Sequence, residues 1–202
     1  MAVITFDCDE VLADLVKAVL HRNNNSILWV PLQWDDIADY FIENMPQFRE
    51  KNVSFLEAKA LFDAVILDHG HVEPIAGMQS LIGSLKRQGH ELYVITARGD
   101  ELYDATIAWL DSHYSGMFSD IVLTNHYDKA KKQCKGDVCE YLWSQLMVED
   151  TIHNSEKVIA KDIPVVIPHK PWNRDYRPVS DLIHKADDAR HIEQILVEKG
   201  LL

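Results

Sequence analysis

The chain has 202 residues, a formal net charge of −12, and a composition that is 47% hydrophobic and 26% charged. This is the composition of a globular protein with enough length for one full hydrophobic core, and no apolar stretch approaches the roughly 20 residues of a membrane span. The acidic balance argues against a protein that binds a nucleic-acid polymer, because such proteins carry basic surfaces.

The N-terminus begins with a short apolar run at residues 2–6, which leads directly into Asp7, Cys8 and Asp9. We expect a buried strand that delivers two carboxylates to its C-terminal end, the edge where open α/β sheets bind their ligands. Two carboxylates so close repel each other and favour a hard cation such as Mg²⁺, which prefers oxygen ligands. The first strand therefore predicts a metal-dependent active site.

Residues 15–73 lack the alternation of strands and helices that follows them. A short amphipathic helix is expected at 15–21, and a second helix is expected after Ser54, which forms a capping-box pattern with Glu57. The segment is rich in aromatic residues, and such rings either stack on a substrate or form the core of the segment itself. We predict a small helical insertion, in which the candidate substrate-facing rings are Trp29, Trp34, Phe41 and Phe48.

From residue 74 onward, helices alternate with strands. Helices are expected at 77–88, 100–113, 136–143, 152–160 and 181–196, and strands at 91–96, 120–124, 145–148 and 164–167. This alternation predicts an α/β fold with a parallel sheet and helices on both faces. We expect residues 1–14 and 74–202 to form the core, and residues 15–73 to form a cap inserted after the first strand.

Three later segments place polar residues at the ends of strands or the start of a helix. The strand at 91–96 ends in Thr96, whose hydroxyl and the following backbone N–H groups, from Ala97 onward, can hold phosphate oxygens. Arg98 either clamps a phosphate or lies on the surface. Lys135 directly precedes the helix expected at 136–143, and it can neutralise a transferring phosphoryl group. The strand at 145–148 runs into two further acids, Glu149 and Asp150.

These segments occur in the order of the motifs of the haloacid dehalogenase superfamily of aspartyl phosphotransferases, which the chain resembles. The closer resemblance is to the 5′(3′)-deoxyribonucleotidase group, through the DxDxxxAD start, the aromatic cap, the ITAR turn and the late KPWNR segment at 170–174. The resemblance implies that Asp7 attacks phosphorus and that Asp9 is the general acid/base. It also implies a Mg²⁺ site made by Asp7, the backbone carbonyl of Asp9, and Asp150.

The chain departs from the superfamily pattern at two positions. The superfamily commonly carries two Asp residues in the fourth motif, or one Asp and another four residues on, where this chain has Glu149 and Asn154. It is open whether Glu149 reaches the metal directly or through water. Trp172 and Asn173 either fold against the site or anchor the C-terminal part of the chain.

The resemblance implies a Mg²⁺-dependent phosphatase of small phosphate monoesters, with (deoxy)nucleoside monophosphates as the expected substrates. The alternatives are a phosphatase of another metabolite, such as a sugar phosphate, and a catalytically silent binding module. We expect a cytoplasmic protein, because the chain shows no signal-peptide pattern and its three cysteines include no CxxC pair. The sequence leaves open whether the protein is a monomer or a homodimer.

Overall fold

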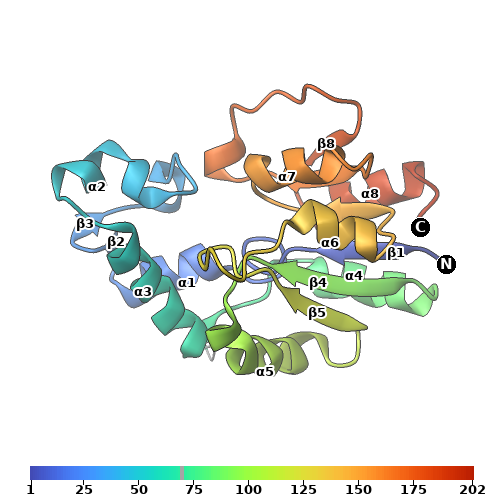
Figure 1. Ribbon diagram of the computed structural model, residues 1–202, viewed down its shortest axis with the longest axis horizontal. Coiled ribbons are helices and arrows are strands. Elements are labelled where there is room, and N and C mark those ends of the chain that lie inside the picture. Colours follow the sequence, from blue (N-terminus) through green and yellow to red (C-terminus); the bar gives the residue numbers. More distant parts are fainter. Residues whose placement is uncertain (69–70) are drawn as a thin grey trace.

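The computed structural model describes residues 1–68 and 71–202. A six-stranded parallel sheet lies at its centre, in the order β5-β4-β1-β6-β7-β8 (Figure 1). The strands are β1 (Val3–Phe6), β4 (Glu91–Thr96), β5 (Asp120–Leu123), β6 (Leu146–Val148), β7 (Val165–Pro168) and β8 (Ile183–Ala186). The parallel α/β architecture predicted from the alternating pattern is confirmed.

Helices cover both faces of the sheet. Side chains of successive strand residues point to opposite faces, so the sheet divides the hydrophobic core into two clusters. One cluster joins the sheet to α4 (Met78–Arg87), α5 (Tyr103–Tyr114) and α8 (Ala189–Glu198). The other joins it to α6 (Lys135–Tyr141) and α7 (Ile152–Ile159). Successive residues of β6 divide between them, since Val148 belongs to the first cluster and Met147 to the second. The sheet is therefore buried on both sides.

The central position of β1 determines where the functional residues meet. Phe6, its last residue, pairs with Val94 of β4 on one side and with Val148 of β6 on the other. The chain passes from β1 to β4 and β5 on one side and then crosses to β6 on the other side of β1, and such a reversal of strand order opens a crevice at the carboxyl ends of the strands. The residues that follow β1, β4 and β6 therefore meet at one edge.

The inserted segment forms the left part of Figure 1, at the opposite end of the sheet from both chain termini. It contains α1 (Leu15–Arg22), a hairpin of β2 (Ser26–Ile27) and β3 (Val30–Pro31), α2 (Pro46–Glu50), α3 (Phe55–Leu67) and two 3₁₀ turns, Trp34–Asp36 and Ile42–Asn44. The predicted capping box is confirmed, because Ser54 and Glu57 bond reciprocally at the start of α3. We call residues 15–68 of this segment the cap.

The chain enters and leaves the cap through two segments that bond to each other. The backbone N–H of Asp14 donates to the carbonyl oxygen of Glu73 at 2.9 Å, and that of Ile75 donates to the carbonyl oxygen of Leu12 at 2.8 Å. These bonds tie both linkers to the loop that follows β1. The position of the cap is thus coupled directly to the residues around Asp7.

The prediction of a single helix at 181–196 is wrong in its first half. Residues 183–186 form β8, which pairs in parallel with β7, and α8 begins only at Ala189. The side chain of Asp188 caps α8 by accepting a hydrogen bond from the backbone N–H of His191 at 2.9 Å. The four residues Ile183–Ala186 fit a helix as well as a strand by their sequence alone, and they form a strand because they pair with β7.

Within the described ranges, no helix is long and apolar enough to cross a membrane.

Candidate active site

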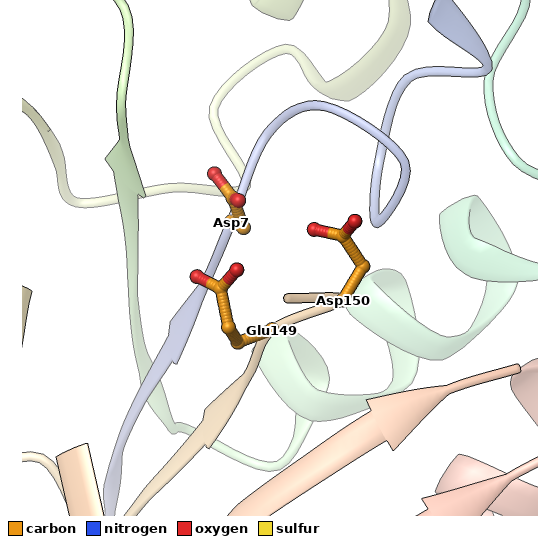
Figure 2. Close-up of side chains that lie close together, drawn as sticks. All are labelled: Asp7, Glu149 and Asp150. Carbon is orange, nitrogen blue, oxygen red and sulfur yellow. The ribbon is translucent and has the colours of Figure 1, made fainter. Parts of the chain in front are cut away.

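Three buried carboxylates meet at the carboxyl ends of β1 and β6. Asp7 follows β1, and Glu149 and Asp150 follow β6; one oxygen of each lies within 4.8 Å of the others. Figure 2 shows the three side chains facing a common space between the two strand ends. Their exposed fractions are 5%, 0% and 1%, so solvent does not screen their mutual repulsion.

Lys135 compensates part of this charge. Its Nζ lies 2.6 Å from Oδ2 of Asp7 and 2.7 Å from Oε2 of Glu149. Burial alone would lower the pKa of Lys135, but the attraction of the two carboxylates outweighs it and raises the pKa above its ordinary value. The ammonium is therefore charged and fixed between the two acids.

The position of Lys135 depends on close packing between α6 and α7. Gly136, the next residue, lies against the backbone of Lys157, and a Cβ at this position would collide with the carbonyl oxygen of Lys157. The absence of a side chain at Gly136 lets the first turn of α6 approach α7 and the sheet. This approach brings the ammonium of Lys135 to the ends of β1 and β6.

The acidic cluster holds three carboxyl groups against one ammonium, so ionising all three acids is unfavourable without a further cation. Burial raises the pKa of Asp7 to about 8, an effect that Lys135 reduces and the charge of Glu149 increases. Burial, with the charges of Glu149 and Asp7, also raises the pKa of Asp150 well above its ordinary value. Clustered carboxylate oxygens of this kind fit a hard divalent cation such as Mg²⁺.

The hydrogen bonds of Glu149 distinguish it from the other two acids. Its Oε1 accepts from the backbone N–H and hydroxyl of Thr151 at 3.1 and 2.6 Å and from Nδ2 of Asn154 at 3.4 Å, while its Oε2 accepts from Lys135. Both of its oxygens are thus engaged by the protein. Asp7 also has both oxygens engaged, Oδ1 by the backbone N–H of Cys8 at 2.7 Å and Oδ2 by Lys135 at 2.6 Å. Glu149 makes the most hydrogen bonds of the three acids and helps to hold Lys135 in place.

Asp9 lies two residues beyond Asp7 and is paired with Arg98. The guanidinium donates from Nη2 to Oδ1 of Asp9 at 2.6 Å and from Nε to Oδ2 at 3.1 Å, while its Nη1 donates to the hydroxyl of Thr106 at 2.9 Å. Arg98 is only 5% exposed. Arg98 therefore does not lie on the surface, and its guanidinium fixes the orientation of Asp9. Its contact with a phosphate stays a prediction.

Thr96 ends β4 next to β1, and it is fully buried. Its hydroxyl accepts a hydrogen bond from the backbone N–H of Arg98 at 3.3 Å, and the carbonyl oxygen of Ala97 accepts from the backbone N–H of His126 at 3.1 Å. The turn is therefore held on both sides. It lies at the same edge of the sheet as Asp7, where a bound phosphate would reach it.

Asp150 is anchored by the 3₁₀ turn Pro171–Asn173. Nε1 of Trp172 donates to Oδ2 of Asp150 at 2.9 Å, and Nδ2 of Asn173 donates to the Asp150 carbonyl oxygen at 2.9 Å. The same amide also donates to the carbonyl oxygen of Pro168 at 2.9 Å. Of the two roles left open from the sequence, the structure shows that this segment folds against the site.

A cavity of about 120 Å³ lies between the cap and the core, next to Asp9 and Arg98. Its walls are largely apolar, and its polar groups gather near Asp9 and near the ion pair of Lys59 and Asp63. The aromatic residues that line it are Tyr40, Phe41, Phe55, Phe62, Tyr127 and Trp172. A flat ring system that enters this cavity would meet aromatic side chains from both the cap and the core.

The four rings singled out from the sequence occupy different environments. Phe41 lines the cavity, whereas Phe48 is fully buried within the cap. Trp34 packs edge-to-face on Trp172, with ring centroids 5.6 Å apart. Trp29 lies in the turn between β2 and β3, is 84% exposed, and does not line the cavity. Of the other cavity rings, Tyr40 lies in an irregular part of the cap, which has no period from which side-chain direction follows. Phe55 and Phe62 belong to α3, and Tyr127 and Trp172 come from the core.

Glu10 is a further buried acid that the sequence did not single out. It is 2% exposed and adopts a left-handed backbone conformation, with φ of 60°. Its Oε1 accepts from the backbone N–H of Val16 at 2.6 Å, and its Oε2 lies 3.5 Å from Nζ of Lys170. Burial raises the pKa of Glu10 to about 7. Glu10 therefore joins the core to the first turn of α1.

Comparison with known families gives a match over nearly the whole chain. The model of the family described as "5' nucleotidase, deoxy (Pyrimidine), cytosolic type C protein" matches residues 1–199. A comparison with curated proteins finds no match.

Solved structures share the fold at low sequence identity. A putative phosphoglycolate phosphatase from Lactobacillus delbrueckii has a TM-score of 0.67 at 13% identity, and the match covers 96% of this chain and 97% of that one. A haloacid dehalogenase-like protein of unknown function from Agrobacterium tumefaciens has a TM-score of 0.60 at 16% identity, covering 96% and 90%. A putative hydrolase of the same superfamily from Bacillus subtilis, bound to magnesium, has a TM-score of 0.59 at 12% identity, covering 97% and 98%.

The raised pKa of Asp7 predicts how stability depends on pH and Mg²⁺. Between its ordinary value of 3.8 and about 8, folded Asp7 holds a proton that the unfolded chain has lost. Without Mg²⁺, the contribution of Asp7 to the free energy of unfolding should therefore fall as the pH rises from about 5 to about 8. Mg²⁺ competes with this proton, so it should raise the midpoint of thermal unfolding more at about pH 8 than at about pH 6.

Thermal unfolding at several pH values, with and without Mg²⁺, measures both effects. The Asp7→Asn variant is the control, because it lacks the titrating group and should show a shallower pH dependence. Equal stabilisation by Mg²⁺ at both pH values would contradict the assignment of Asp7 as a ligand.

The hydrogen bond from Trp172 to Asp150 predicts a second effect on metal binding. Trp172→Phe keeps an aromatic ring beside Trp34 but removes the indole N–H that orients the Asp150 carboxylate. Loss of such a partner should weaken Mg²⁺ binding about tenfold, as measured by calorimetric titration. Trp143→Phe, at a position 84% exposed, is the control. An unchanged Mg²⁺ affinity in Trp172→Phe would refute the positioning role.

Proposed function

The chain belongs to the 5′ nucleotidase, deoxy (pyrimidine), cytosolic type C family, and from this membership and the geometry of the site we propose a Mg²⁺-dependent phosphatase of (deoxy)nucleoside monophosphates that acts through an aspartyl-phosphate on Asp7. The observation that carries the mechanism is the contact of 2.6 Å between Asp7 and Lys135, at the meeting point of three buried carboxylates. We also propose, from the family description, that it acts in the cytosol.

Asp7 and Asp150 would hold the Mg²⁺ through their side chains, with the backbone carbonyl oxygen of Asp9 as a third ligand. When bound, the ion would neutralise charge on the acids and on the phosphate, and it would keep Asp7 deprotonated. The nucleophile needs this help, because the pKa of Asp7 without the ion is about 8. Lys135 adds a fixed positive charge beside the Asp7 carboxylate.

The first chemical step is the attack of an Asp7 oxygen on phosphorus, with departure of the nucleoside oxygen. Asp9 would protonate this leaving oxygen and then take a proton from the water that cleaves the aspartyl-phosphate. Arg98 holds the Asp9 carboxylate in two hydrogen bonds, so the acid/base group has a defined orientation before substrate binds. Thr96 and the amide groups of its turn would hold the phosphate oxygens.

The cavity beside Asp9 supports a nucleoside as the leaving group. Tyr40, Phe41 and Tyr127 offer ring faces on which a base can stack, and base stacking on aromatic side chains tolerates different bases. At the far end, Lys59 and Asp63 supply a donor and an acceptor for the polar edge of a base. The cap closes this cavity over the phosphate site and would exclude bulk water during the reaction.

Phosphate release from a panel of substrates tests the proposal. The panel holds ribo- and deoxyribonucleoside monophosphates and sugar phosphates, each with and without Mg²⁺. We expect Mg²⁺-dependent release that favours deoxynucleotides, and a loss of at least about a thousandfold in Asp7→Asn. That variant should keep its fold, because it removes a charge from a repelling cluster, and circular dichroism checks this.

Other outcomes of the panel would contradict parts of the proposal. Release from sugar phosphates alone would retain the mechanism but exclude the nucleotidase assignment. No release from any substrate would exclude the phosphatase mechanism and favour a binding module. Normal turnover in Asp7→Asn would show that another group is the nucleophile.

A further inference from the structure

Four basic side chains gather near the active site without belonging to it. His126 and Lys132 lie on the segment between β5 and α6, and His153 and Lys157 lie on α7. Nζ of Lys132 is 3.5 Å from Nε2 of His126, and the ring centroids of His126 and His153 are 6.3 Å apart. We call these four residues the basic cluster.

The basic groups of the cluster lower the pKa values of His126, His153 and Lys157. Burial, together with the charges of Lys132, Lys157 and His153, lowers the pKa of His126 to about 4. Burial and Lys132 likewise lower the pKa of Lys157. Each of these groups disfavours the charge of its neighbours, which is the opposite of what an enclosed carboxylate would cause.

The lysines of the cluster differ from other lysines of the chain. In the part of the chain that the structure describes, neither Lys132 nor Lys157 forms an ion pair, whereas Lys131 pairs with Asp100 and Lys161 with Asp137. Glu156 offsets the effect of the lysines on His153 only in part. Two lysines without an ion-pair partner in the described residues, beside two imidazoles that can donate hydrogen bonds, form a local anion-binding feature in a chain with a net charge of −12.

The cluster opens onto the phosphate-binding side of the active site. His126 and His153 line a small pocket with Thr151 and Asn154, and Tyr40, Phe41 and Ala97 complete its lining. The last three residues also line the large cavity beside Asp9. An anion at the cluster would therefore lie next to the turn after Thr96, and it would share a wall with a nucleoside in the cavity.

We propose that the basic cluster is a second anion subsite, which binds a second phosphate group on a substrate whose first phosphate lies at Asp7. The substrate class is then a nucleoside bisphosphate, and the inference rests on the proposed function for the position of the first phosphate. Only the phosphate at Asp7 is transferred, so the second phosphate leaves with the nucleoside product. Ammonium and imidazole groups supply the donors that phosphate oxygens accept, and a phosphate monoester carries close to two negative charges at neutral pH.

Binding to a non-reacting enzyme tests the subsite without depending on turnover. Deoxythymidine 5′-monophosphate and deoxythymidine 3′,5′-bisphosphate are titrated calorimetrically into Asp7→Asn with Mg²⁺. We expect the bisphosphate to bind about tenfold more tightly, as charge-assisted hydrogen bonds at a partly exposed site allow. Adding Lys132→Gln and Lys157→Gln should abolish this difference and leave the affinity for the monophosphate unchanged.

A charge-matched variant distinguishes binding at the cluster from the general effect of removing two positive charges. Lys86→Gln with Lys129→Gln removes the same charge from two exposed lysines and should retain the tenfold difference. Equal affinities for the two nucleotides, or an equal loss in the matched variant, would overturn the proposal. Binding of inorganic phosphate at the cluster without such a difference would also overturn it, because the subsite would then take free phosphate.

The proposed function and the second anion subsite can be contradicted independently of each other. If the wild-type enzyme hydrolyses no nucleotide but the difference in affinity depends on the cluster, the proposed function is wrong and the second anion subsite is supported. If the wild-type enzyme hydrolyses the monophosphate but the cluster makes no difference to bisphosphate binding, the nucleotidase mechanism is supported and the subsite is overturned.

Discussion

The ammonium of Lys135 lies between two buried carboxylates, of Asp7 and Glu149, that would otherwise repel each other in a site closed to water. The rest of the active site depends on this contact. It requires β1 and β6 to be adjacent in the sheet and α6 to lie close to α7, which Gly136 permits. One ammonium does not offset three carboxyl groups, so the pKa values of Asp7 and Asp150 are raised, and a divalent cation would favour their charged forms. The fold thus holds three carboxyl groups together with a single ammonium as their positive partner.

Two positioning contacts connect this charged centre to its surroundings. Arg98 orients Asp9 from the turn that follows β4, so the proposed acid/base group is bonded directly to the turn proposed to hold the phosphate. Trp172 bonds to Asp150 while its ring packs on Trp34 of the cap. A displacement of Trp34 with the cap would therefore change the position of Trp172 and of the Asp150 carboxylate bonded to it. The leaving-group cavity and the charged centre share these residues, so substrate recognition and chemistry are coupled through packing.

The sequence predicted the elements that carry a local signal and missed those that depend on distant partners. Asp7 and Asp150 could be placed because each follows a short apolar strand, and parallel strands meet at one edge. The partner of Arg98 is 89 residues away in the chain, and no local pattern reveals such a pair. β8 was interpreted as helix because its four residues form a strand only through pairing with β7. The exposure of Trp29 and the burial of Phe48 likewise depend on the irregular path of the cap, which has no regular period.

The covalent role of Asp7 is the central claim, and rapid-quench peptide mapping tests it most directly. The wild-type protein is mixed with a deoxynucleoside monophosphate and Mg²⁺, quenched in acid within the first turnover, digested, and examined by mass spectrometry. The account predicts a phosphoryl group on the peptide that contains Asp7, located on that residue by fragmentation. A phosphoryl group on Asp9 or Asp150, or rapid phosphate release with no phosphorylated peptide at any time point, would contradict it.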